Sequence, residues 1–154
     1  MKKYLLALLV LSACTPATTP ASRGPAPAAG ANQLTGAATA RAAVEQFLNA
    51  VRAEDIQAMS VNFGTSQGPA RDNMDRDELE KRLVILQCFF NHDKFRLLGD
   101  SPGDDGHRII GAELTRGGQS RSPRFYVISG PGRRWYVDNM EIAVVRDFCR
   151  DAPR

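Results

Sequence analysis

The chain of 154 residues lacks the short motifs that identify many enzyme sites directly. It has no glycine-rich phosphate loop, no serine elbow and no histidine–glutamate zinc helix, and it contains only two histidines. It also lacks internal repeats and any basic motif interleaved with aromatic residues. Without its first two lysines, 18 basic residues stand against 17 acidic ones, a net charge of about +1. The missing motifs argue against the enzyme classes that use them. The near-neutral charge and the lack of a basic motif argue against nucleic-acid binding.

Long apolar runs are absent as well. The run near the N-terminus covers residues 4–13, and these 10 residues fall far short of the roughly 20 that a bilayer-spanning helix needs. Two lysines precede the run, and a serine and an alanine, both small, lie at its end. This layout is typical of a secretory signal. The sequence therefore predicts a signal peptide over residues 1–13 and argues against a permanent transmembrane anchor.

The quartet Leu11, Ser12, Ala13 and Cys14 resembles the lipoprotein box of bacteria. In that family the cysteine thiol receives a diacylglyceryl group, the chain is cut before the cysteine, and the new amino group is acylated. The resemblance implies that Cys14 carries acyl chains such as palmitate, and two or more chains anchor a protein stably to a membrane. Thr15 stands where an aspartate favours inner-membrane retention in enterobacteria, so we expect the outer membrane of the cell envelope, facing the periplasm. The alternative is an ordinary secretory signal with an incidental cysteine.

Residues 14–35 are predicted to be a lipidated, disordered linker. From residue 15 to residue 35 there are 21 residues, of which 17 are Ala, Pro, Thr, Ser or Gly. Such a composition offers too little apolar bulk to offset the entropy of ordering the chain. The remaining residues 36–150 are enough for a single core and short for two, and residues 151–154 form a tail.

The predicted domain has a helical half followed by a strand half. Apolar residues recur three and four apart over residues 39–53, and a shorter helix opens at residues 54–55. After a loop at 64–74, the strongest helical pattern runs from Asp75 to about Asn91. Glycine-rich breaks then separate four β-branched and aromatic segments, which are residues 94–98, 108–115, 124–129 and 135–146. This order predicts an α+β domain with N-terminal helices packed on a curved antiparallel sheet.

Two segments give this pattern a family resemblance. "AAVEQFLNAVRAEDIQAM" (42–59) and "RRWYVDNMEI" (133–142), with a long helix and strands between them, resemble the nuclear-transport-factor-2-like superfamily. Domains of that superfamily are cones, in which a bent sheet wraps a long helix and leaves a hydrophobic cavity at the wide end. The resemblance therefore implies a cone with such a cavity.

Cys88 and Cys149 remain after the predicted lipidation of Cys14. Paired thiols beyond the cytoplasmic membrane are usually oxidised, so we predict a disulfide that closes a loop of about 60 residues. In the chain-entropy model it removes about 4 kcal/mol of unfolded-state entropy. Two unrelated buried thiols are one alternative. The other is a zinc site with His92 and His107, for which no closely spaced ligand pair pre-organises the second half.

The leading hypothesis for function is a non-catalytic lipoprotein that binds a small apolar ligand or another envelope protein. Tyr126, Trp135 and Tyr136 are the candidate binding residues, because large aromatic side chains dominate cavity linings and interface energies. No catalytic residue, cofactor or metal site is predicted.

Two other functions stay open. Some relatives implied by the resemblance are isomerases, cyclases or dehydratases that act inside the cone. Tyr126, Tyr136 and Asp138 could contribute to such a site, with Asp55 near the helix junction, although no motif assigns them a role. The structural interpretation is favoured: the aromatic residues line the core or a cavity, and residues 138–139 form a bulge or bend in the last strand. The third function is a structural part of an envelope complex, or a homodimer formed through the sheet.

Overall fold

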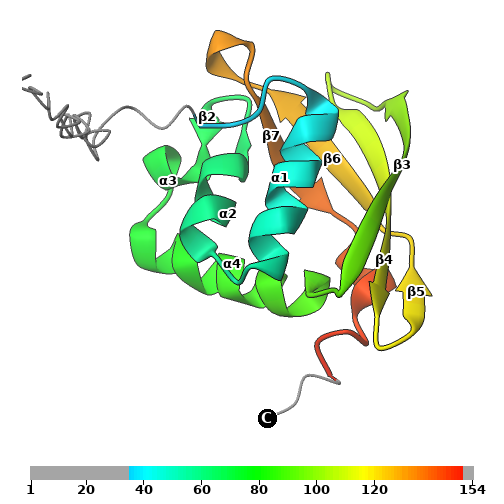
Figure 1. Cartoon of the computed structure of the whole chain (residues 1–154). Coiled ribbons are helices and arrows are strands. Elements are labelled where there is room, and N and C mark those ends of the chain that lie inside the picture. Colours follow the sequence, from blue (N-terminus) through cyan, green and yellow to red (C-terminus); the bar gives the residue numbers. More distant parts are fainter. Residues whose placement is uncertain (1–34, 151–154) are drawn as a thin grey trace, which may run out of the picture. The chain divides into compact units, whose positions relative to one another are not determined.

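The structure, a computed structural model, describes residues 35–150 (Figure 1). The predicted signal peptide, Cys14, nearly all of the predicted linker and the predicted tail lie outside the described residues. The helices are α1 (Ala40–Arg52), α2 (Ile56–Asn62), α3 (Ala70–Asn73) and α4 (Arg76–Phe90), with 3₁₀ helices η1 (Pro131–Arg133) and η2 (Ile142–Val145). The strands are β1 (Gly64–Thr65), β2 (Gly68–Pro69), β3 (Lys94–Pro102), β4 (Arg108–Arg116), β5 (Gln119–Arg121), β6 (Arg124–Ser129) and β7 (Trp135–Met140).

Side-chain caps start the three longer helices where the sequence predicts them. Thr39 caps α1 by accepting from the backbone N–H of residue 42, and Asp55 caps α2 in the same way at residue 58. Asp75 caps α4 and accepts from two backbone N–H groups, those of residues 77 and 78. These bonds satisfy donors that a helix leaves without partners at its N-terminus. None of these helices, in the described part of the chain, is long and apolar enough to cross a bilayer.

The sheet is antiparallel and curved, with the order β3-β4-β6-β7 and with β5 added to β4. It stays open and does not close into a barrel. β4 shows why one of its faces is buried, because Ile110, Ala112 and Leu114 alternate along the strand and are all fully buried. The predicted α+β class with helices on an antiparallel sheet is therefore confirmed.

Several predicted boundaries are wrong. β3 runs to Pro102 rather than to residue 98, and β5 forms between the strands predicted at 108–115 and 124–129. The last strand ends at Met140 rather than near residue 146, because Glu141 bonds back to the first residue of β6 and no strand partner follows. The chain then turns into η2, which buries Val145 in the core. The predicted loop at 64–74 contains the β1–β2 hairpin and the four-residue helix α3.

The core lies between the helices and the sheet. α1 lies against the sheet, and α2 and α4 pack beside it and against each other (Figure 1). Phe125 of β6 meets two helix residues there, with ring centroids 6.5 Å from Phe47 of α1 and 5.3 Å from Phe90 of α4. All three rings are fully buried. Their side chains occupy space where the family resemblance implies a cavity.

Candidate functional site

Tyr136, a predicted binding residue, is buried and holds the start of the domain in place. Only 2 % of Tyr136 is exposed, and its hydroxyl lies 3.2 Å from the Oγ1 of Thr35. A Cβ added to Gly36 would lie 2.7 Å from its ring, and one added to Gly130 would lie 2.9 Å away. The ring is thus clasped between two glycines, which leaves it no surface for a ligand.

The other two predicted binding residues lie apart from this clasp. Trp135 is half-buried against the core, and its backbone pairs with Ala37, with both N–H···O distances at 2.9 Å. Tyr126 lines a depression on the opposite face of the sheet from the helices, since its neighbours Phe125 and Val127 point into the core. The structure therefore does not gather the three aromatic residues into one site.

The depression at Tyr126 has a volume of about 180 Å³ and contains a histidine–carboxylate pair. His107 Nε2 lies 2.7 Å from Asp138 Oδ2, and both side chains are partly buried. Asp138 reaches this position because it is the extra residue of a β-bulge in β7, between the pairs formed by Val137 and Asn139. The predicted bulge at residues 138–139 is confirmed, and bulges commonly re-aim a side chain in this way.

Both ring nitrogens of His107 are occupied. Nδ1 lies 3.0 Å from the backbone carbonyl of Asp104, which can only accept, so Nδ1 donates. Nε2 faces the carboxylate of Asp138, and this hydrogen bond is the main cause that raises the pKa of His107 above its usual value. His107 therefore ties the β3–β4 turn to β7 and has no free nitrogen for a substrate proton or a metal ion.

Cys88 and Cys149 form a disulfide in the structure, with their Cα atoms 5.0 Å apart. The bond joins the end of α4 to the segment that follows η2, and both residues are partly buried. The zinc alternative needs both sulfurs together with His92 and His107. His107 instead pairs with Asp138, and no group of three or more metal-ligating side chains comes together within the described residues.

His92, the second histidine, lies in the core. Only 2 % of it is exposed, and its Nδ1 lies 2.8 Å from the carbonyl of Phe90, while Nε2 has no partner in the described chain. Its ring stands edge-on to Phe95, with centroids 5.3 Å apart. Burial lowers the pKa of His92, so the neutral form is favoured. His92 is therefore a packed core residue.

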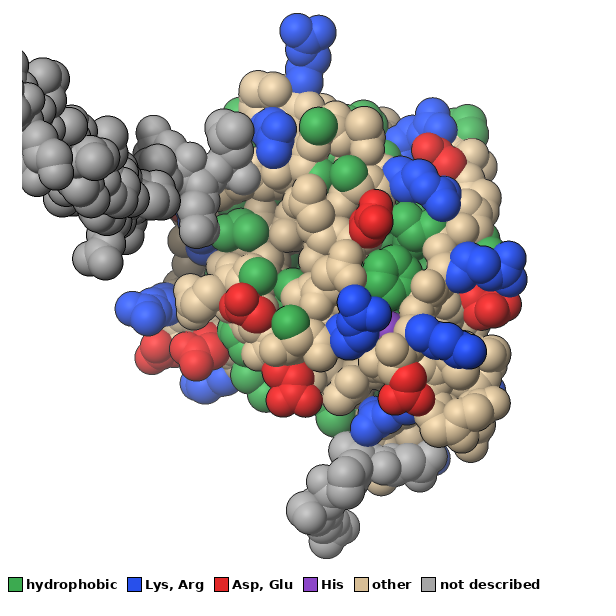
Figure 2. Space-filling model, in the orientation of Figure 1, with side chains coloured by type: hydrophobic (Ala, Val, Ile, Leu, Met, Phe, Trp, Pro, Cys, Tyr) green, Lys and Arg blue, Asp and Glu red, His purple; other side chains and the backbone are tan. Residues whose placement is uncertain are grey.

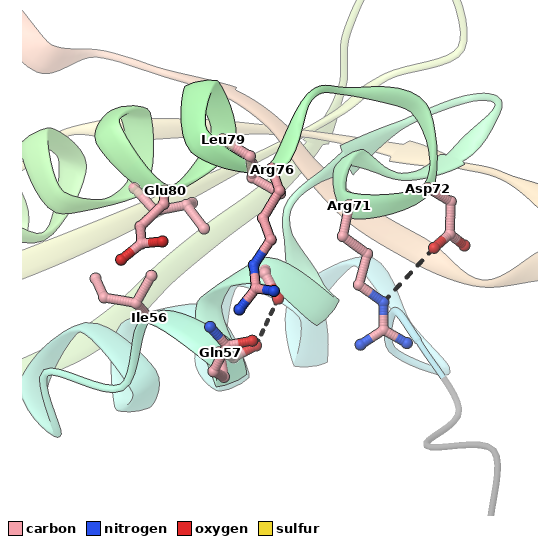
Figure 3. Close-up of a pocket in the computed structure, with 9 residues that line it drawn as sticks. Ile56, Gln57, Arg71, Asp72, Arg76, Leu79 and Glu80 are labelled. Atoms are coloured by element: carbon pink, nitrogen blue, oxygen red, sulfur yellow. Dashed lines mark hydrogen bonds and ion pairs between the residues drawn. The ribbon is translucent and has the colours of Figure 1, made fainter.

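A cavity of about 220 Å³ lies on the helical side, between α2, α3 and α4 (Figure 3). Its apolar wall is formed by Leu79 and Leu83, both buried, and by the half-buried Ile56. Ser60 is buried there too, and its hydroxyl donates to the carbonyl of Gln57 at 2.7 Å. This combination of an apolar wall with convergent polar groups is typical of a small-molecule site.

Charged side chains line the rim of this helix cavity. Arg71 comes from α3, and Arg76 and Glu80 come from the first two turns of α4. In Figure 3 Arg76 extends toward Gln57 of α2, with Arg71 on one side of it and Glu80, beside Ile56, on the other. The sequence does not reveal this cavity, because Arg71 lies in the segment predicted to be a loop.

On the sheet, several charged side chains form ion pairs with one another. Figure 2 shows basic and acidic side chains next to each other along the edge over β3 and β4, where Arg96 pairs with Glu113 and Arg108 with Asp100. Elsewhere Arg124 pairs with Glu141. These carboxylates neutralise guanidinium groups that would otherwise attract a phosphate backbone.

Comparison with known proteins adds no assignment to these sites. No protein-family model matches the chain, and no curated protein shows significant sequence similarity to it. The helix cavity and the His107–Asp138 depression are therefore interpreted from their own geometry and chemistry.

Proposed function

We propose that this protein is a lipid-anchored, non-catalytic binding protein of the bacterial cell envelope. Lipid on Cys14 holds it at the membrane, the linker at residues 14–35 lets the domain extend away, and the domain takes up a small ligand with an apolar part. The helix cavity carries this proposal, because buried leucines and polar groups converge there around about 220 Å³ of space. The ligand site is then on the helical side and not inside the sheet.

The fold proposed for the domain is the nuclear-transport-factor-2-like cone. Three features support it: the order of helices before strands, the curved antiparallel sheet, and the helix α1 packed against that sheet. In this cone the phenylalanines of α1, α4 and β6 fill the interior. A ligand that entered there would have to displace packed aromatic rings, which makes the helix cavity the better site.

A non-catalytic role is supported by the state of the histidine–carboxylate pair. A general base needs a free lone pair within hydrogen-bond reach of the proton that it removes. Both nitrogens of His107 already donate or pair within the protein. His107 is therefore not available as the base that the isomerase, cyclase or dehydratase alternative would need in this depression.

Binding of an envelope protein is a second candidate function, favoured by one surface of α4. Val84 and Ile85 are the large apolar side chains that are most exposed in the described residues, at 50 % and 55 %. They lie on one exposed side of α4 together with Asp77, Glu80 and Lys81. Exposed apolar side chains with a charged rim are a feature of protein interfaces.

The proposed function is tested by identifying what co-purifies with the protein. Protein extracted from its own membranes is compared with an Ile56→Trp variant, whose larger side chain obstructs the helix cavity. We expect organic extracts of the wild type to contain a small molecule by mass spectrometry, and we expect the variant to lose it while its melting temperature stays within a few degrees. Protein that is free of small molecules but carries a stable protein partner would instead support the α4 surface.

A further inference from the structure

We propose that the ligand of the helix cavity carries one acidic group, a carboxylate or a phosphate, which Arg71 and Arg76 bind, and an apolar group that contacts Leu79 and Leu83. This inference rests on the proposed function, because it names the chemistry of the ligand for that same cavity. It is carried by the placement of two guanidinium groups, from two different helices, at the rim of a cavity whose wall is formed by buried leucines.

Arg76 is the first reason for an acidic ligand. It is the first residue of α4, where the helix dipole favours negative charge and opposes a cation. The neighbouring residues of that turn are acidic, as the helix dipole favours; they are Asp75, Asp77 and Glu78. Arg76 is exposed, and it makes no hydrogen bond or ion pair with any residue of the described chain. An anion in the cavity would offset the unfavourable position of this side chain.

Arg71 is the second reason. It extends from α3 alongside Arg76, on the side away from Glu80 (Figure 3). Its ion pair is with the adjacent Asp72, at 3.7 Å, and that carboxylate is 64 % exposed and points away from Arg76. An ion pair that is this long and this exposed to solvent contributes little to stability. The guanidinium of Arg71 can therefore bind a second anion. Two arginines from separate elements can then bind two oxygens of one acidic group.

The size of the cavity and the position of Glu80 define the rest of the ligand. Its volume of about 220 Å³ corresponds to about seven water molecules at about 30 Å³ each, so it accepts a short chain or one end of a longer molecule. Glu80 lies at the end opposite Arg71, beside Ile56 (Figure 3). A second acidic group at that end would meet a like charge. We therefore infer a ligand with a single acidic group.

The test uses the full chain with Cys14→Ser, which cannot be acylated at that position, and four probes of similar length. Hexanoate and butyl phosphate represent the two acidic groups, hexanol lacks the charge, and adipate carries a second carboxylate. Binding is measured by titration and located by amide chemical shifts. We expect either hexanoate or butyl phosphate to bind at least about tenfold more tightly than hexanol and adipate, with shifts at Leu79 and Leu83.

Variants separate the acidic group from the cavity itself. Arg76→Gln should bring the preferred anion to within about twofold of hexanol, whereas the control Arg82→Gln, on the same helix but paired with Glu78, should leave its affinity unchanged. If hexanol binds as tightly as the anions, the acidic-group inference is wrong while the proposed function stands. If hexanol, hexanoate and butyl phosphate all fail to shift the cavity amides, both fail.

Discussion

Two glycines determine how the buried tyrosine of β7 is held. Gly36 has φ +68°, a backbone conformation that side-chain-bearing residues rarely adopt, and its Cα hydrogen faces the ring of Tyr136. Gly130 approaches the same ring from another side. The contact with Gly36 joins residues 100 positions apart in the chain, so the sequence shows the tyrosine but not its burial. A prominent aromatic residue is therefore structural here.

Gly36→Ala should destabilise the domain more than Gly106→Ala does. Both glycines have positive φ, so each substitution incurs roughly 1–2 kcal/mol of backbone strain. Gly106 has nothing within 4 Å of an added Cβ, whereas at Gly36 the methyl group overlaps the Tyr136 ring and adds about 1–3 kcal/mol. Urea unfolding of both variants measures the difference. Equal losses would mean that Tyr136 is not clasped as described.

The His107–Asp138 pair makes stability depend on pH. The pKa of His107 is raised, so the pair stabilises the fold fully below the unfolded-state pKa of about 6.5, and this stability is lost as pH rises through the folded-state pKa. His92 acts in the opposite sense: its pKa is lowered, so its contribution is present above about pH 6.5 and is lost as pH falls. The two effects overlap in the wild type and have to be separated by substitution.

Asp138→Asn separates them. We expect its loss of stability, relative to wild type, to be larger near about pH 5.5 than near about pH 8.5, because His107 loses its charge as the pH rises through its raised pKa. The control is Asp100→Asn on β3, whose partner Arg108 keeps its charge throughout, so its loss should not follow His107. Denaturant unfolding at the two pH values gives the comparison. A loss for Asp138→Asn that is independent of pH contradicts the described pair.

Secondary-structure elements with a strong local sequence signal lie where they were predicted, and elements without such a signal were missed or misplaced. The helices α1 and α4 have both a periodic apolar face and a capping side chain, so their positions could be predicted. The four-residue helix α3 is too short to show any period. The end of β7 depends on Glu141 binding to Arg124, a contact between two strands that no local pattern reveals.

The disulfide fixes the end of α4 to the C-terminal segment. Replacing both cysteines with serine should lower the free energy of unfolding by about 2–5 kcal/mol, because the unfolded chain gains the freedom that a 61-residue separation had removed. Intact mass with and without reductant shows whether the bond exists in the purified protein. If Cys88 and Cys149 both react with an alkylating reagent before reduction, the predicted pairing is wrong.

At the scale of the whole molecule, the helix cavity could not be predicted from the sequence, because its lining residues are distant along the chain. The cavity is enclosed by Ile56, Arg71 and Leu83, which lie on three helices, and only their packing brings them together. The predictions for residues 1–35, which are a signal peptide, a linker and a lipidated cysteine, need no tertiary contact and could therefore be made from the sequence. In the proposed function, anchoring and ligand binding are carried by separate parts of the chain.

The proposed lipid on Cys14 is the step on which the proposed location of the molecule depends, and with it the oxidising surroundings expected for the disulfide. Cells that express the wild type or Cys14→Ser are grown with labelled palmitate, and the protein is then isolated and fractionated with the membranes. We predict label in the wild type alone, membrane association that is lost in Cys14→Ser, and accumulation of a precursor when globomycin is added. Wild-type protein without label, processed normally in the presence of globomycin, would contradict lipid anchoring.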